Sequence, residues 1–223
     1  MTEKVTIDIW SDVMCPWCVI GYKNLEAALA GLEGEIEAEI RWLPFELNPD
    51  MPPEGEESRA HIARKYGRTP EQAEAGRTMM AERAAAAGFP FDYTGPGDPP
   101  RSMLWNTFDA HKLLKWTLDS AGPKAQTRLK LALFAAHFQQ RRNVGNRDVL
   151  LDVVEEQGLD RAAAMAALDD PQVAAEVRAE EQLAFDNNVS GVPAMVIDRK
   201  FIVPGAQDPE TYANVLRKVV GKR

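Results

Sequence analysis

The 223-residue sequence has little of what marks several large protein classes. It contains only two cysteines, whereas a disulfide-stapled extracellular domain carries more of them, spread along the chain. No stretch approaches the roughly 20 consecutive apolar residues needed to span a bilayer. Its 26 basic residues are outnumbered by 34 acidic ones, which gives a formal charge of -8. This balance argues against a nucleic-acid-binding surface, because such a surface needs clustered positive charge.

The first residues also lack the pattern of a secretory signal, which begins with a basic stretch and continues as a long apolar run. Here Met1–Lys4 leads directly into a short alternating segment, Val5–Trp10. We therefore expect a cytoplasmic location and no membrane partner. No glycine-rich phosphate-binding pattern is present either, so nucleotide binding has no support.

Both ends of the chain have mixed α/β character. Val5–Trp10 alternates with a period of two, which predicts a strand. Pro16 suits the first position of a helix that Gly31 ends, and Ile36–Leu43 alternates again. After a helix expected from Asp170-Pro171 to about Asn187, three further elements are predicted: the strands Ala194–Ile197 and Phe201–Val203, which form a hairpin, and a last helix capped by Asp208-Pro209.

The middle of the chain is predicted to be helical. Thr69-Pro70-Glu71-Gln72 is a capping box, and Gly88 ends the helix that it starts. Four more helices are expected, at Ser102–Ser120, Lys124–Gln140, Arg147–Gln157 and Asp160–Leu168. We predict one α/β core, residues 1–57 and 167–223, interrupted by a helical insertion at residues 58–166.

The strongest chemical signal is Cys15-Pro16-Trp17-Cys18, placed where the first strand meets its helix. Cysteines three apart in a first helical turn are neighbours, so they can form a disulfide with little backbone movement. Cys15 lies at the helix start, where free N–H groups favour an anion, and this position predicts a lowered pKa for its thiol. We expect Cys15 to attack a disulfide and Cys18 to resolve the mixed disulfide.

Two simpler explanations of the cysteine pair are half of a zinc site and a pair of inert buried thiols. A closed zinc site needs four ligands. The three histidines, His61, His111 and His137, lie in the insertion without zinc-finger spacing. We therefore expect no metal.

Ser11–Cys18 followed by Gly21 resembles the opening of the DsbA-like thioredoxin-fold proteins, specifically their FrnE-like branch. Asn106–His111 resembles the helical-domain signature of that branch, and Gly191-Val192-Pro193 its cis-proline loop. The resemblance extends over essentially the whole chain. It implies a thioredoxin fold with an inserted all-helical domain, and dithiol–disulfide exchange with cysteine-containing proteins or low-molecular-weight thiols.

Carried over residue by residue, the resemblance makes Cys15 the nucleophile, Cys18 the resolving cysteine and Pro193 the cis-proline that faces them. Pro16, Trp17, Val192 and Pro193 are then candidate substrate-binding residues. It implies no cofactor beyond the redox-active disulfide, with glutathione as an optional co-substrate.

Two polar residues near the motif have more than one interpretation. His111 lies on an apolar helix face, either as a core histidine with a satisfied hydrogen bond or as a residue that lines the groove between insertion and core and influences Cys15. Asp12 is a turn or capping residue, or it tunes the thiolate, and capping is the interpretation that we favour.

Two other functions remain open beside disulfide exchange. The same architecture resembles the kappa glutathione transferases and the 2-hydroxychromene-2-carboxylate isomerases, which are glutathione-dependent. Those enzymes generally replace the cysteine pair with a serine site, and retention of both Cys15 and Cys18 favours redox exchange. A binding module or chaperone with a vestigial dithiol is the other alternative. The sequence does not indicate an oligomeric state.

Overall fold

A four-stranded mixed sheet forms the centre of the molecule. The computed structural model describes residues 2–222. The strand order is β2-β1-β5-β6. The first two strands along the chain are parallel, and the other neighbouring pairs are antiparallel. The strands are β1 (Glu3–Ser11), β2 (Ile36–Pro44), β5 (Ala194–Ile197) and β6 (Phe201–Pro204). The expected strands at both ends, including the final hairpin, are confirmed.

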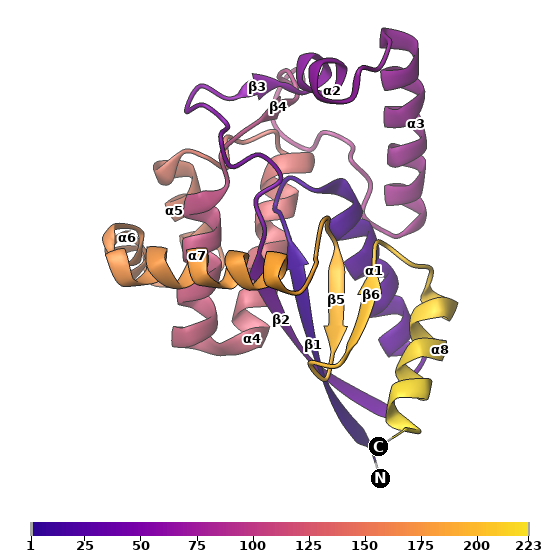
Figure 1. Cartoon of the computed structure of the whole chain (residues 1–223). Helices are drawn as coiled ribbons and strands as arrows, with labels where there is room; N and C mark the ends of the chain where they lie inside the picture. The colour runs from indigo at the N-terminus through magenta and orange to yellow at the C-terminus, as the bar shows by residue number, and fades with distance from the viewer. Residues whose placement is uncertain (1, 223) are drawn as a thin grey trace.

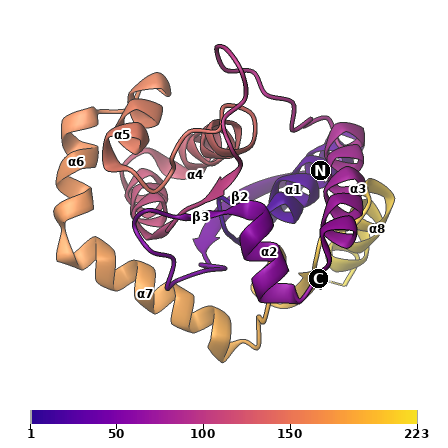
Figure 2. The ribbon, with the colours of Figure 1, turned by 90° about the horizontal axis from the view of Figure 1, so that it is seen from above.

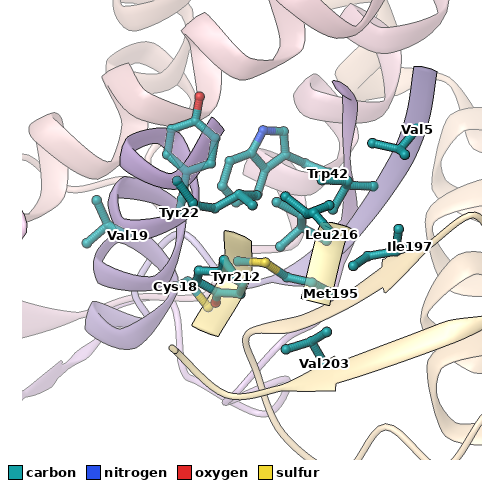
Figure 3. Packing of buried hydrophobic residues seen from close by; sticks show 14 of the residues in the cluster. Val5, Cys18, Val19, Tyr22, Trp42, Met195, Ile197, Val203, Tyr212 and Leu216 are labelled. Atoms are coloured by element: carbon teal, nitrogen blue, oxygen red, sulfur yellow. The ribbon is translucent and has the colours of Figure 1, made fainter. Parts of the chain in front are cut away.

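One face of the sheet packs against helices from both ends of the chain. These are α1 (Pro16–Ala30) and α8 (Pro209–Val220), which lie side by side in Figure 1. The side chains of β1 that point to this face are completely buried because the period-two alternation of a strand directs them there. Figure 3 shows that Cys18 belongs to this apolar cluster, with Tyr212 and Met195 near it. The second cysteine of the motif is thus a core residue.

The other face carries α7 (Pro171–Asp186), which crosses in front of the sheet in Figure 1. Trp10 of β1 packs there with Ala184 and Ala194. Its indole N–H donates to the carbonyl of Glu180 at 3.4 Å. The helix start is fixed by Asp170, whose side chain accepts from the backbone of Gln172.

The segment between β2 and α7 is mostly helical, as expected, and Figure 2 shows it from above. Its first long helix has the predicted capping box at Thr69, made reciprocally with Gln72. A short antiparallel pair, β3 with β4, was not predicted. The elements are β3 (Glu56–Glu57), α2 (Ser58–Tyr66), α3 (Pro70–Ala86), β4 (Met103–Leu104), α4 (Phe108–Phe138), α5 (Arg147–Glu156) and α6 (Arg161–Asp169).

The helix expected at Ser102–Ser120 is wrong in its first turn and a half. Met103–Leu104 is extended because it pairs with Glu56–Glu57, and α4 begins only at Phe108. The two helices expected on either side of Gly122 form one element with a break. Gly122 has φ 81° and ψ 177°, outside the helical region, and Pro123 has no N–H to donate. The two halves of α4 are therefore joined by a kink at Gly122.

The second half of α4 is attached directly to the sheet. The side-chain amide of Gln126 accepts from the backbone N–H of Trp42 at 2.9 Å and donates to its carbonyl at 2.8 Å. Trp42 lies in the edge strand β2, so this amide satisfies backbone groups that another strand would otherwise pair. Insertion and core are thus joined by buried polar contacts, and their division at residues 57 and 167 stays a prediction. Within residues 2–222, no helix is long and apolar enough to cross a membrane.

Candidate active site

The two cysteines lie at the start of α1, on the turn that follows β1. Cys15 is the residue that caps the helix, and Pro16 occupies its first turn. The backbone N–H of Cys15 donates to Asp12 at 3.1 Å, and that of Cys18 donates to Cys15 at 3.1 Å. Both thiols are free. Cys15 is 3% exposed and Cys18 is completely buried, so Cys15 is the less buried of the two residues.

The loop before β5 meets the cysteines from the other end of the chain. The Cys15 thiol donates to the carbonyl of Val192, with sulfur and oxygen 3.6 Å apart. The peptide bond between Val192 and Pro193 is cis. A Cβ atom added to Gly21 would lie 3.2 Å from Pro193 Cγ, closer than side chains normally pack. Glycine at position 21 therefore lets α1 approach this loop.

The rim of the site is formed by Pro16 and Trp17, which are both half-buried. The Trp17 ring packs on the edge of the apolar core. The guanidinium carbon of Arg83, on α3, lies 5.8 Å from the centre of that ring, a cation–π distance. Trp17 is thus held between core and insertion.

Burial raises the pKa of the Cys15 thiol well above its ordinary value, opposite to the sequence-based expectation. The neighbouring Cys18 thiol and the charge of Asp12 act in the same direction. The helix start does favour the thiolate, through the backbone N–H of Cys18. In the free, reduced protein this stabilisation is smaller than the desolvation penalty of a nearly inaccessible sulfur.

Asp12 is completely buried and organises the loop that carries Cys15. Its carboxylate accepts from the backbone N–H of Met14 at 3.2 Å and from that of Leu47 at 2.8 Å. It does not cap α1, because no side chain accepts from the first turn of that helix. Burial raises the pKa of Asp12, and these hydrogen bonds oppose the rise. Its role is to tie the cysteine turn to the segment after β2.

Lys130, on α4, is a buried residue beside the cysteines that the sequence reasoning did not select. It is completely buried, and its ammonium donates to the carbonyl of Ser11 at 3.4 Å. Burial lowers its pKa to about 8, and the opposing interactions are with Cys18, Asp12 and Cys15, in that order. Gln126, Lys130 and Phe134 are spaced four residues apart, so they lie on one helix face among apolar residues. This spacing is the sequence signal that could have indicated a buried lysine.

His111 is buried below the cysteine turn rather than in an open groove. Its Nε2 lies 4.0 Å from Asp12 Oδ1. Within residues 2–222 it makes no hydrogen bond to either cysteine. Burial and the charge of Lys130 lower its pKa well below the usual range, so the imidazole is neutral at pH 7. His111 is buried, as a core histidine is, but its Nε2 has no hydrogen-bond partner among residues 2–222, so the hydrogen bond expected of a core histidine is not made at this atom.

No group of three or more potential ligands in the described part of the chain could hold a metal ion. The site holds two free thiols, with buried charged residues behind them. The structure brings together Cys15, Cys18, Pro16, Trp17, Val192 and Pro193, and it places His111 next to Asp12.

Comparison with known proteins agrees with this geometry. The probable DsbA oxidoreductase SCO1869 of Streptomyces coelicolor is 32% identical, with a TM-score of 0.85 over 98% of this chain and 91% of that one. The Bacillus subtilis protein YwbO is 26% identical over 95% of this chain and 96% of its own length. The Pseudomonas aeruginosa cytosolic disulfide reductase DsbM with GSH shares the fold, with a TM-score of 0.62 and 18% identity over 96% of this chain and 98% of that one.

The family comparison covers nearly all of the sequence. Residues 6–217 match the family described as the DSBA-like thioredoxin domain. The expected fold, an α/β thioredoxin fold with helices inserted between its strands, is confirmed. The chain belongs to the DSBA-like thioredoxin domain family.

Proposed function

We propose that this protein is a thiol–disulfide oxidoreductase that exchanges disulfides with cysteine-containing proteins or low-molecular-weight thiols. The observation that carries the proposal is the pair of free thiols in one helical turn, with Cys15 nearer to the surface and Cys18 behind it. In this order the first thiol can meet a partner, and the second can reach only the first.

The reaction is a pair of sulfur displacements. The Cys15 thiolate attacks a partner disulfide, one partner sulfur leaves as a thiol, and a mixed disulfide forms. The Cys18 thiolate then attacks Cys15, the mixed disulfide breaks, and the second partner sulfur leaves as a thiol. The protein dithiol is oxidised to a disulfide, and the partner disulfide is reduced to a dithiol. With an oxidised protein and a reduced partner, the same steps run in reverse.

The partner is proposed to bind over the rim formed by Pro16, Trp17, Val192 and Pro193. Pro16 and Trp17 are half-buried and supply apolar surface beside Cys15. The carbonyl of Val192 accepts from the Cys15 thiol in the free protein, and it becomes available when that sulfur joins a partner. An extended substrate could then pair with this backbone as an added strand. Assignment to the FrnE-like branch and to the cytoplasm stays a prediction.

The test is exchange with insulin and with a small aromatic disulfide, using the two single-cysteine variants. Cys15→Ser should abolish insulin reduction. Cys18→Ser should accumulate mixed disulfides, because nothing resolves them. If Cys15→Ser trapped partners and Cys18→Ser did not, the roles of the two cysteines would be reversed.

A glutathione-dependent isomerase is the alternative that this test also addresses. Such enzymes generally use a serine site, and this chain keeps both cysteines. Glutathione-dependent turnover that survives in the double variant Cys15→Ser, Cys18→Ser would favour that alternative over disulfide exchange.

A further inference from the structure

Lys130 is buried in a way that ordinary packing does not explain. Its side chain is completely inaccessible to water. Within residues 2–222 its ammonium forms no ion pair with a carboxylate, and its hydrogen bond to the carbonyl of Ser11 is long, at 3.4 Å. The ammonium also lies over the rings of Trp42 and Phe134, 5.3 and 5.0 Å from their centres.

An ammonium in such a place is energetically expensive. Taking a charge out of water costs several kcal/mol after relaxation, and two ring faces with one long hydrogen bond recover only part of that. A methionine at this position would fill the same space without the penalty. The buried charge therefore calls for a functional explanation. Groups whose pKa is shifted by burial beside a reactive pair are candidates for function.

The groups around Lys130 indicate what the role of its charge is. The titratable groups that interact with it are Cys18, Cys15 and Asp12 from the cysteine turn and α1, and His111 from its own helix. His111 is neutral at pH 7, and the Asp12 carboxylate is already held by two backbone N–H groups. Cys18 is the strongest of the attractive partners.

Cys18 needs such a partner because its surroundings are apolar. It is completely buried in the cluster that contains Val19, Trp42 and Tyr212 (Figure 3). A thiolate in that cluster receives no water, so charge formation there is unfavourable unless a fixed cation is near. Lys130 borders the same cluster through Trp42 and Phe134.

We propose that Lys130 is the buried cation that stabilises the Cys18 thiolate during resolution of the mixed disulfide. This inference rests on the proposed function. Cys18 loses its proton as its thiolate forms beside the ammonium, and this proton balances the one that the leaving partner sulfur takes up. The thiolate attacks Cys15, the Cys15–partner bond breaks, and the partner sulfur leaves with the electron pair and takes a proton. Lys130 stays protonated throughout, so no further reactant is needed.

The test separates the two displacements in one measurement. Reduced protein is mixed with one equivalent of 5,5'-dithiobis(2-nitrobenzoate), and release of the coloured thiol is followed in time. Attack by Cys15 releases the first coloured thiol, and attack by Cys18 releases the second. Lys130→Met should slow the second phase roughly tenfold or more at neutral pH and move its pH midpoint upward, with a smaller effect on the first phase.

Three further variants make the result specific. Lys130→Gln is a second neutral substitution, used in place of Lys130→Met if that protein does not fold, and it should show the same slowing. Lys130→Arg keeps the charge and should restore most of the second-phase rate. Lys112→Met removes the other buried lysine of α4 and should leave both phases unchanged.

Two outcomes would overturn the inference. One is a second phase in folded Lys130→Met or Lys130→Gln that matches wild type across the pH range. The other is equal slowing in Lys112→Met, which would indicate a general effect of disturbing α4. Failure of the proposed function looks different, because wild type itself would then release no second coloured thiol.

Discussion

Two regions along α4 each bury a lysine, and they treat it in opposite ways. Lys112, near the junction with α6, pairs with Asp109 at 2.5 Å and donates to the carbonyl of Leu168 at 2.6 Å. Lys130, beside the cysteines, has one long hydrogen bond to the carbonyl of Ser11 and two ring faces. Both side chains are buried, so burial alone does not distinguish them.

The difference lies in what the charge is paired with when the protein is at rest. The partners of Lys112 are present permanently, so its charge contributes to the structure that holds α4 against α6. Lys130 interacts with Cys18, Asp12 and Cys15, and in the inference above its charge is used when the Cys18 thiolate forms. A buried charge with permanent partners therefore indicates a structural role, whereas a buried charge without them indicates a role in the reaction. The predictions that follow extend this comparison or try to break it.

The largest expected effect concerns a third buried base on the same helix, His137. Burial and the charge of Arg141 lower its pKa to about 3, from an ordinary 6.5. Between these two values the unfolded chain binds a proton that the folded protein does not, so stability falls as the pH falls from about 6.5 to about 3. The loss at the acid end should be roughly 3–5 kcal/mol.

Urea titrations of wild type and His137→Leu at several acid pH values test this. The leucine variant should lose less stability over that window, because it has no imidazole to protonate in the unfolded chain. Parallel acid losses in the two proteins would show that His137 is protonated in the folded state.

The second prediction breaks the paired lysine. Lys112→Met leaves the carbonyl of Leu168 and the carboxylate of Asp109 with Arg147 as their remaining partner, and it should lower stability by about 1–3 kcal/mol. Lys130→Met removes a charge that forms no close ion pair with a carboxylate within residues 2–222, and should leave stability equal or higher. Urea unfolding of both reduced proteins at neutral pH measures the difference. A larger loss in Lys130→Met would contradict the comparison.

Most of this architecture could be predicted from the sequence because it rests on local signals. Period-two alternation located β1 and β2, and proline after a capping residue located the starts of α1, α3 and α8. The cysteine turn followed from the same signals. The short pair β3–β4 could not be predicted, because each of its strands has two residues and depends on a partner far along the chain.

The electrostatics of the site were harder to predict, for a related reason. The helix start at Cys15 is a local feature, and it suggested a lowered pKa. The desolvation that raises the pKa of Cys15 comes from packing of distant segments around the turn. Lys130 escaped notice because a lysine on an apolar helix face is usually assumed to extend its stem to water. Only the packed structure shows that its ammonium stays inside.

The smallest expected effect is a pH dependence that isolates Lys130 itself. Its pKa is about 8 in the folded protein against an ordinary 10.5. Above about pH 8 the folded protein releases this proton, whereas the unfolded chain keeps it until about pH 10.5, so stability from this group rises with pH across that window. Any advantage of Lys130→Met at about pH 7 should therefore shrink by about 1 kcal/mol at about pH 9.

Wild type, Lys130→Met and Lys112→Met are compared in a Cys15→Ser, Cys18→Ser background, so that a thiolate beside Lys130 cannot contribute to the difference. Lys112→Met supplies the background slope. A constant difference between wild type and Lys130→Met from about pH 7 to about pH 9 would mean that Lys130 keeps its proton through this range. The ammonium would then have a stronger permanent partner than the long hydrogen bond to Ser11, and the contrast between the two lysines would fail.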